Sequence, residues 1–450
     1  MRKLKIITTA LVLSIAFGMT VFAQVKVPPM NIKQRTLSNG LRVVTLQDNS
    51  NPTVAIHVWY DVGGKNDPEG RSGFAHMFEH MMFKSTKNMP NEKMDRLTED
   101  VGGFNNASTR EDYTNYYEVV PSNYLESLLW AEAERMQNLN VDEANFASER
   151  DVVKEEFRQS VLDPPYGRLY QFLDSLSFEK HPYQRGVIGN LDELTAATTK
   201  DANQFYKTFY RPDNAVLIVV GDFQEKQLSD WVDKYFGKVK KPEAKIPRVT
   251  VAEPQWTKER RFNQTGPIVP FPATAIIYKA PVSKSEDVPV LRLVENILSG
   301  GESSRLYQGM IREQQIAQEA SFYADIRVDP GLLFFLGIAA QGHTSAEMEK
   351  AFLAELKKMQ EKPVSAQELE KAKNQLITDT LRRRENNDGK AIAIEQAIAY
   401  QGDPLAVNSD IKRLQAVTPA DIQRVMKKYF ADNNRVVIYY DQEKKEGDSK

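Results

Sequence analysis

The sequence predicts an α+β protein of two homologous domains, each a mainly antiparallel β-sheet with helices packed on one face. Strand-like segments followed by runs of amphipathic helices occur in both halves of the chain, which is typical of this class. One helix-to-strand unit also occurs twice, as residues 199–222 and 418–441. Each copy runs from Thr and Asp through a helical stretch with two aromatic residues at its end, then Asn, then a β-branched run. This repetition indicates an internal duplication.

Apolar periodicity predicts the individual elements in chain order. Alternating or continuous apolar runs predict strands, and an apolar residue every three or four positions predicts helices. The predicted strands are residues 41–48, 53–63, 104–120, 274–281 and 331–340, and the clearest predicted helices are residues 123–139 and 345–360.

Six prolines and little apolar periodicity mark residues 240–272 as an extended linker. We therefore expect a signal peptide at residues 1–23, an N-terminal domain at 24–240, a linker at 241–272 and a C-terminal domain at 273–450.

The first 23 residues have the pattern of an export signal. Basic residues at positions 2, 3 and 5 precede an apolar run that ends in Val21-Phe22-Ala23, a small-x-small cleavage pattern. An uncleaved membrane anchor is the alternative, because the run approaches the ~20 residues that span a bilayer. We expect cleavage, no stable anchor afterwards, and a periplasmic or secreted protein.

Charge and cysteine content exclude several classes of function. Without residues 1–23, which carry three basic residues, 56 of the 59 Lys and Arg remain against 61 Asp and Glu, so the mature chain has a net charge of −5. This acidic balance argues against a nucleic-acid partner. The chain has no cysteine, so any bound metal must be held by His, Asp or Glu.

Residues 73–80, Gly-Phe-Ala-His-Met-Phe-Glu-His, carry the clearest chemical signal. On a helix that begins after an N-cap at Ser72, His76 and His80 lie one turn apart with Glu79 beside them. Two imidazoles and a nearby general base are what a catalytic zinc ion requires, here in the inverse of the commoner zincin order. The alternative is two partly exposed histidines on an ordinary helix.

A third ligand would decide between these interpretations, and the acidic stretch further along the chain offers several. Glu149 and Glu156 share a helix face but lie about 10 Å apart along its axis, so they cannot both bind one ion. Glu155 is turned about 100° from Glu156, and Asp151 and Glu143 are further alternatives. Spacing alone does not choose among them.

Several longer motifs resemble one family. The chain is similar to the inverzincin zinc peptidases of the pitrilysin family, which includes the mitochondrial processing peptidase and insulin-degrading enzyme, in its half-length form. The resemblance covers nearly all of the mature chain. It is carried by GFAHMFEHMMFKST, VGGFNNASTREDYTNYYEVVP, SERDVVKEEF, HPYQRGVIGNLDEL, FYRPDNAVLIVVGDF and GGESSRLYQGMIRE.

The resemblance implies a zinc-dependent endopeptidase that binds one Zn²⁺ per chain and cleaves peptides or unfolded small proteins. It implies His76 and His80 as zinc ligands, Glu156 as the third ligand and Glu79 as the general base. Glu149 matches an acidic position that supports metal binding and activity in the family, and we expect it to act from outside the ligand set.

The resemblance also implies that residues 104–120 form an edge strand to which the substrate adds as an extra strand. Asn106 and Ala107 are then the expected substrate contacts. An ordinary buried strand is the alternative.

Many relatives carry an Arg and, seven residues later, a Tyr that reach the active site from the second half. This chain keeps Arg312 but has Glu319 in place of the Tyr. We therefore expect a dimer, either with a zinc-less homologous subunit that carries the Arg/Tyr pair or of two identical chains in which Tyr323 or Tyr307 substitutes. A non-catalytic scaffold or assembly subunit is the alternative function.

Overall fold

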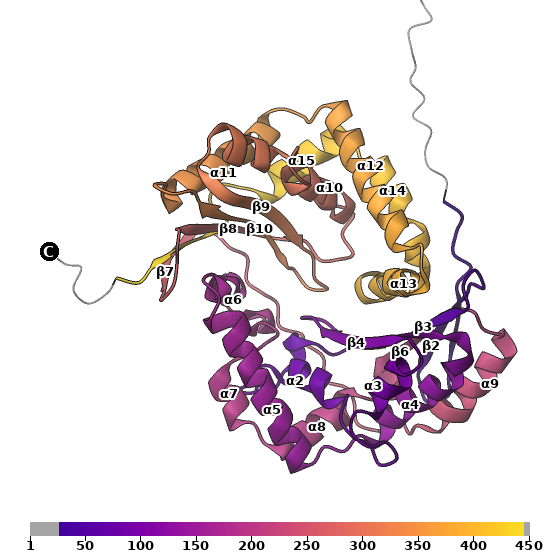
Figure 1. Cartoon of the computed structure of the whole chain (residues 1–450). Helices are drawn as coiled ribbons and strands as arrows, with labels where there is room; N and C mark the ends of the chain where they lie inside the picture. The colour runs from indigo at the N-terminus through magenta and orange to yellow at the C-terminus, as the bar shows by residue number, and fades with distance from the viewer. Residues whose placement is uncertain (1–26, 445–450) are drawn as a thin grey trace, which may run out of the picture. The chain divides into compact units, whose positions relative to one another are not determined.

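Two mixed, mostly antiparallel sheets organise the chain in a computed structural model that describes residues 27–444 (Figure 1). The first sheet has the strand order β1-β2-β6-β3-β5-β4, and the second has the order β7-β11-β8-β10-β9. The strands of the first sheet are β1 (Lys33–Thr36), β2 (Arg42–Gln47), β3 (Thr53–Tyr60), β4 (Phe104–Thr109), β5 (Thr114–Pro121) and β6 (Ala215–Gly221); those of the second are β7 (Arg260–Gly266), β8 (Ala273–Lys279), β9 (Ala317–Asp325), β10 (Leu332–Ala339) and β11 (Val436–Gln442).

Helices follow the strands in both halves, which confirms the predicted α+β class. Those of the first half are α2 (Phe74–Met81), α3 (Lys93–Glu99), α4 (Leu125–Asn138), α5 (Glu143–Phe157), α6 (Gly167–Ser177), α7 (Leu191–Ala196), α8 (Thr199–Phe209) and α9 (Glu225–Tyr235); those of the second are α10 (Val288–Ser299), α11 (Ser345–Glu361), α12 (Ala366–Arg383), α13 (Asn387–Gln401), α14 (Asp410–Ala416) and α15 (Pro419–Tyr429).

The repeated sequence unit forms the same structure twice. Helix α8 leads into β6, and α15 leads into β11. Both helices begin with a reciprocal capping box, Thr198 with Asp201 and Thr418 with Asp421. Strand β6 is parallel to β2 and antiparallel to β3, and β11 is likewise parallel to β7 and antiparallel to β8. Apart from β1, the two sheets therefore share one topology.

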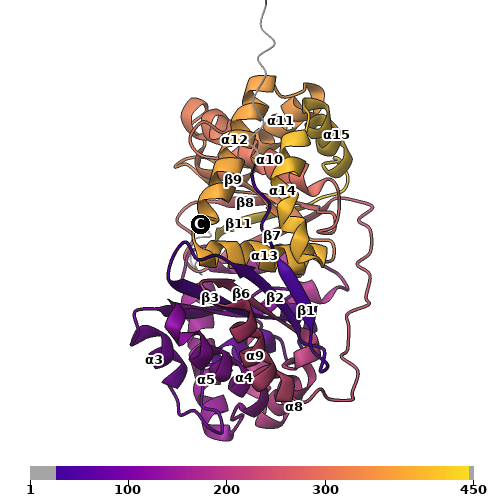
Figure 2. The same ribbon diagram turned by 90° about the vertical axis from the view of Figure 1, so that its right-hand side faces the viewer.

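Each sheet is packed on both faces, which goes beyond the prediction of helices on one face. Helices α2, α4, α8 and α9 bury one face of the first sheet, and α10, α11 and α15 bury one face of the second. The opposite face of the first sheet contacts α13, which belongs to the second half (Figure 2). The opposite face of the second sheet contacts α6, which belongs to the first half. Each half therefore contributes one helix to the other half's sheet.

Two predicted segments contain more structure than the sequence indicated. Residues 104–120, predicted as one strand, form the hairpin β4–β5, in which the Arg110 amide donates to the Tyr113 carbonyl (2.8 Å). Residues 240–259 form neither helix nor strand, but β7 follows them inside the predicted linker. The division of the chain into domains at 240 and 273 stays a prediction.

The described chain divides into two units, the first of which ends at residue 30 and the second of which begins at residue 31. Of the first unit the structure describes only residues 27–30, which are neither helical nor extended in a sheet, so the predicted signal peptide lies outside the described residues. None of the helices within residues 27–444 is long and apolar enough to cross a membrane.

Candidate metal centre

Helix α2, which carries both histidines of the motif, is fixed at its first turn by a carboxylate from the loop just before it. Ser72 was the expected N-cap, and that expectation is wrong, because the N-cap residue is Gly73 in a left-handed conformation (φ 88°). Asp67 supplies the capping oxygens, and it accepts hydrogen bonds from the amides of Gly73 (2.6 Å) and Ala75 (2.8 Å). The start of α2 is thereby tied to the loop that follows β3.

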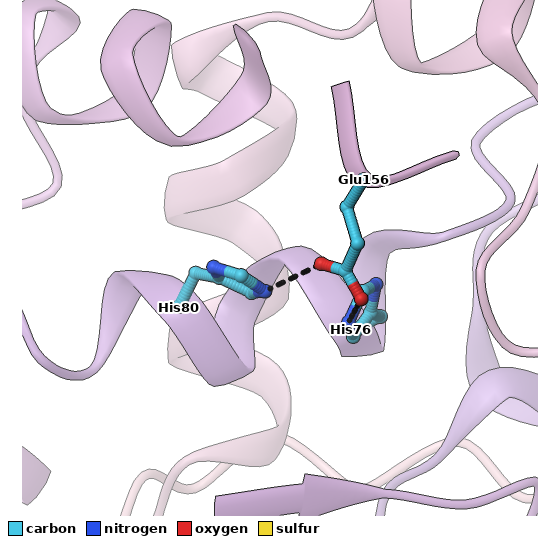
Figure 3. A group of neighbouring side chains, drawn as sticks. All are labelled: His76, His80 and Glu156. Carbon is cyan, nitrogen blue, oxygen red and sulfur yellow. Dashed lines mark ion pairs between the residues drawn. The ribbon is translucent and has the colours of Figure 1, made fainter. Parts of the chain in front are cut away.

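Three side chains converge beside α2 (Figure 3). Glu156 on α5 places one carboxylate oxygen 3.7 Å from His76 Nε2 and the other 3.3 Å from His80 Nε2. These three residues each offer a donor atom within 4.8 Å of the others, and residues 27–444 contain no second group of this kind. Donors bound tetrahedrally to zinc lie about 3.3 Å from one another, so this set of two imidazoles and one carboxylate fits a zinc ion.

The two histidines differ in protonation. Burial lowers the pKa of His76 to about 4, so its imidazole is neutral near pH 7, as a metal ligand must be. Burial also acts to lower the pKa of His80, but hydrogen bonds to Glu149 and Glu156 outweigh it and raise the value to about 9. Metal binding would therefore release a proton from His80.

Glu149 lies on the other side of the His80 ring. Its Oε2 is 3.6 Å from His80 Nδ1, and its Oε1 is 2.6 Å from Lys84 Nζ. Burial acts to raise the pKa of Glu149, and the contacts with His80 and Lys84 overcome this and lower it. Glu155 is exposed instead and pairs with Arg158 (3.1 Å). Of the acidic residues left open by spacing, Glu156 is the one that faces both histidines.

Glu79 lies beside the three donors but is held by a different element. Its Oε2 accepts a hydrogen bond from the Thr109 hydroxyl at the end of β4 (2.6 Å). Burial raises the pKa of Glu79, while Thr109 and the positive charge of His80 act to lower it. The carboxylate therefore lies close to the histidines without joining them in the group of three donors.

The predicted substrate contacts lie on β4, which forms one edge of the first sheet. The Arg110–Tyr113 hydrogen bond sets the alternation of the ladder, so the main-chain groups of Ala107 point away from β5 toward the open edge. The main-chain groups of Asn106 face β5 instead. The side-chain oxygen of Asn106 accepts a hydrogen bond from the Ala107 amide (2.8 Å). Ala107 therefore presents main-chain groups at the edge, whereas Asn106 presents its side chain.

The predicted second-half contact lies elsewhere. Arg312 is exposed in η7 (Tyr307–Glu313), and no contact described for residues 27–444 joins it to His76, His80 or Glu156. Glu319 is exposed on the edge strand β9, and Tyr323 on the same strand stacks on Phe334 with ring centroids 5.0 Å apart. Within one chain, the structure does not bring Arg312 to the three donors.

Sequence reasoning missed three residues that position this centre: Lys84, Asp67 and Thr109. Lys84 lies in the turn that follows the end of α2 at Met81, so helical spacing from His80 does not indicate it. Asp67 and Thr109 act on α2 from separate segments, and no local pattern in the sequence connects them to it.

Comparisons with known proteins match the chain to one family. A model of the insulinase family, peptidase family M16, matches residues 42–190, and a model of the M16 peptidase inactive domain matches residues 196–376. The zinc protease PqqE of Helicobacter pylori is 29% identical over 430 residues, which cover 95% of this chain and 96% of that protein. A probable mitochondrial-processing peptidase subunit beta of Arabidopsis thaliana is 25% identical over 89% of this chain and 76% of its own.

A solved structure shares the fold. The crystal structure of a protease from Helicobacter pylori superposes with a TM-score of 0.87 and 29% identity over 91% of this chain and 99% of that one. Two models of one family thus match successive parts of the chain, and the resemblance seen in its motifs is confirmed. The chain belongs to peptidase family M16, the insulinase family.

Proposed function

We propose that this protein is a zinc-dependent endopeptidase that cleaves peptides or unfolded small proteins. The observation that carries the proposal is the convergence of His76, His80 and Glu156, with the Glu79 carboxylate held beside them by a separate strand. The names of relatives as zinc proteases support the same chemistry.

His76, His80 and Glu156 would hold one zinc ion per chain. When bound, the ion would polarise the scissile carbonyl and lower the pKa of a bound water molecule. Glu149 would act from outside the ligand set, since its carboxylate faces His80 Nδ1 and can orient the ring while Nε2 faces Glu156.

Glu79 is the proposed general base and then the general acid. Its Oε2 is held by Thr109, so Oε1 is the atom that would take the proton of the attacking water and pass it to the leaving amine. The open edge of β4 would hold the peptide as an added strand, with hydrogen bonds from the Ala107 main chain and further contact from the Asn106 side chain.

The chain would act as the catalytic subunit of a dimer after export. Arg312 does not meet the metal donors within the chain, and Glu319 stands where many relatives have Tyr, so a zinc-less partner that carries the Arg/Tyr pair would complete the site. One relative is named as a subunit of a processing peptidase, which supports this arrangement. A single polypeptide throughout the active fraction from the native source would rule out the heterodimer and leave the homodimer as the alternative. Export rests on the signal-like pattern of residues 1–23.

A second candidate is a non-catalytic scaffold or assembly subunit. The match of residues 196–376 to a model named for an inactive domain favours it for the second half of the chain. The first half has two histidines and one carboxylate in a metal-binding arrangement, with the Glu79 carboxylate beside them, which favours catalysis.

The test is cleavage of a quenched fluorescent peptide library by the purified protein, with zinc measured in the same sample. Turnover that a chelator removes and zinc restores, and that Glu79→Gln abolishes at unchanged zinc content, would support the endopeptidase. Near-normal activity of Glu79→Gln would disprove the role of Glu79, and a protein that binds no zinc would favour the scaffold. One zinc ion per chain without turnover would mean that another protein supplies missing groups.

A further inference from the structure

The hydroxyl of Thr109 has one hydrogen, and the surrounding contacts assign it to Glu79. Thr109 Oγ1 lies 2.6 Å from Glu79 Oε2. The neighbouring Thr114 hydroxyl is 3.4 Å from Thr109 Oγ1 and has a better acceptor, the Val62 carbonyl, at 2.9 Å. Thr109 therefore donates to the Glu79 carboxylate, while the Thr114 hydroxyl donates to the Val62 carbonyl.

The main-chain groups of Thr109 also point toward the side on which Glu79 lies. The alternation set by the Arg110–Tyr113 hydrogen bond leaves Thr109, like Ala107, with its amide and carbonyl turned away from β5. The Thr109 amide also acts, together with the hydroxyl, to lower the pKa of Glu79. Thr109 is the last residue of β4. The Glu79 carboxylate thus lies beside the Thr109 amide, where an added strand would otherwise place a carbonyl acceptor.

The hydrogen bond from Thr109 connects the proposed general base, Glu79, to β4, the strand on whose open edge the substrate is proposed to bind. Ala107, whose main-chain groups face the open edge, precedes Thr109 by two residues on β4. We propose that Thr109 is the positioning residue for Glu79, which holds the carboxylate in register with a peptide aligned on Ala107. This inference rests on the proposed endopeptidase function and assigns a residue to its proton-transfer step.

The hydrogen bond matters because the terminal torsion of a Glu side chain is broad, so nothing else in the side chain selects one carboxylate orientation. Misplacing a general base forfeits part of the 10²- to 10⁴-fold that such a group typically contributes. Replacement of Thr109 should therefore slow the chemical step and leave peptide binding and zinc binding nearly intact.

The experiment compares Thr109→Val, which keeps the shape and removes the donor, with Thr109→Ser, which restores it. We expect kcat to fall about 10- to 100-fold in Thr109→Val with KM within about threefold, and Thr109→Ser to recover most of kcat. Ser108→Ala is the matched control, because the Ser108 hydroxyl donates to Asn115 on the opposite face of the strand. Zinc per chain, and peptide binding measured in the Glu79→Gln background with and without Thr109→Val, should not change.

The outcomes separate this inference from the function on which it rests. An active wild-type enzyme whose kcat survives in Thr109→Val, or is lost equally in Thr109→Ser, would overturn the positioning role and leave the endopeptidase intact. A wild type that neither binds zinc nor cleaves peptides would overturn the proposed function itself. If Thr109→Val lacks zinc or does not fold, Thr109→Ala takes its place, and full activity in that variant would also overturn the inference.

Discussion

His57 and Glu395 are separated by 338 positions in the sequence, yet His57 Nδ1 lies 3.0 Å from Glu395 Oε2. The other ring nitrogen of His57, Nε2, lies 3.2 Å from Asp388 Oδ1. Asn115 donates to the same Glu395 oxygen at 2.9 Å. His57 is fully buried on β3, and both carboxylates come from α13. This contact fastens a helix of the second half to the sheet of the first.

The contact predicts a pH dependence of stability. Burial acts to lower the pKa of His57, but hydrogen bonds to Asp388 and Glu395 outweigh it, so the folded-state pKa lies above the ordinary value of 6.5. From the first sheet, Tyr117 lies beside the His57 ring, and Asn115 donates to the Glu395 carboxylate that faces it. The stabilisation is fully present below the unfolded-state pKa near 6.5 and is lost as the pH rises through the folded-state value.

We therefore expect the melting temperature of the wild type to fall on raising the pH above about 6.5 more steeply than that of His57→Gln. Removal of one partner from a buried ion pair typically costs about 3–5 kcal/mol, so His57→Gln should also be less stable at pH 6. His343→Gln is the control, because His343 is partly exposed and its Glu347 partner lies 3.5 Å away on the surface. Parallel pH profiles for wild type and His57→Gln would contradict the prediction.

The third metal ligand can be tested by a pair of neighbouring substitutions on α5. Glu156 faces both histidines, whereas Glu155 is exposed and pairs with Arg158. Glu156→Gln should weaken zinc binding by more than about 100-fold, since a ligand is lost, and Glu155→Gln should change it less than about twofold. Titration of metal-free protein with zinc against a competing chelator measures both. Equal affinities for the two variants would exclude Glu156 as a ligand.

Glu149 should affect zinc affinity less than a ligand does. It faces His80 Nδ1 and is itself paired with Lys84, and carboxylates in this position commonly contribute 10- to 100-fold to metal affinity. We expect Glu149→Gln to lower zinc affinity within that range in the same titration. Asp151→Asn, two residues away at a 70% exposed side chain, should bind zinc like the wild type. A Glu149→Gln protein that also binds like the wild type would remove the orienting role.

The sequence predicted what depends on local spacing. The interval between His76 and His80 fixes both side chains on one helix face, and the repeat at 199–222 and 418–441 contains its own helix, cap and strand, so these features follow from neighbouring residues. Glu156 could not be separated from Glu155 without the resemblance, because the choice depends on how α5 is rotated against α2.

Contacts between residues far apart in the sequence could not be predicted from local patterns. His57 looked like an ordinary residue of an apolar strand, and its partners follow it by more than 300 positions. The hairpin turn at 110–113 was missed for a related reason, since its residues carry no glycine or proline to mark the break. The packing of α13 and α6 on the opposite half's sheet depends on tertiary contacts that periodicity does not report.

Helix α6 provides a test of that exchanged packing. It follows the metal-donor helix α5 in the chain and contacts β8 and β11 of the second sheet. Leu169, 1% exposed, belongs to the apolar cluster that α6 shares with this sheet, whereas the next residue, Tyr170, is 53% exposed. Leu169→Ala should lower the free energy of unfolding by about 2–5 kcal/mol, and Tyr170→Ala by less than about 1 kcal/mol, in urea denaturation. A Leu169→Ala protein as stable as Tyr170→Ala would show that α6 contributes little to the second sheet. A loss confined to Leu169→Ala would instead show that the segment following the metal-donor helix depends on the second half for its stability.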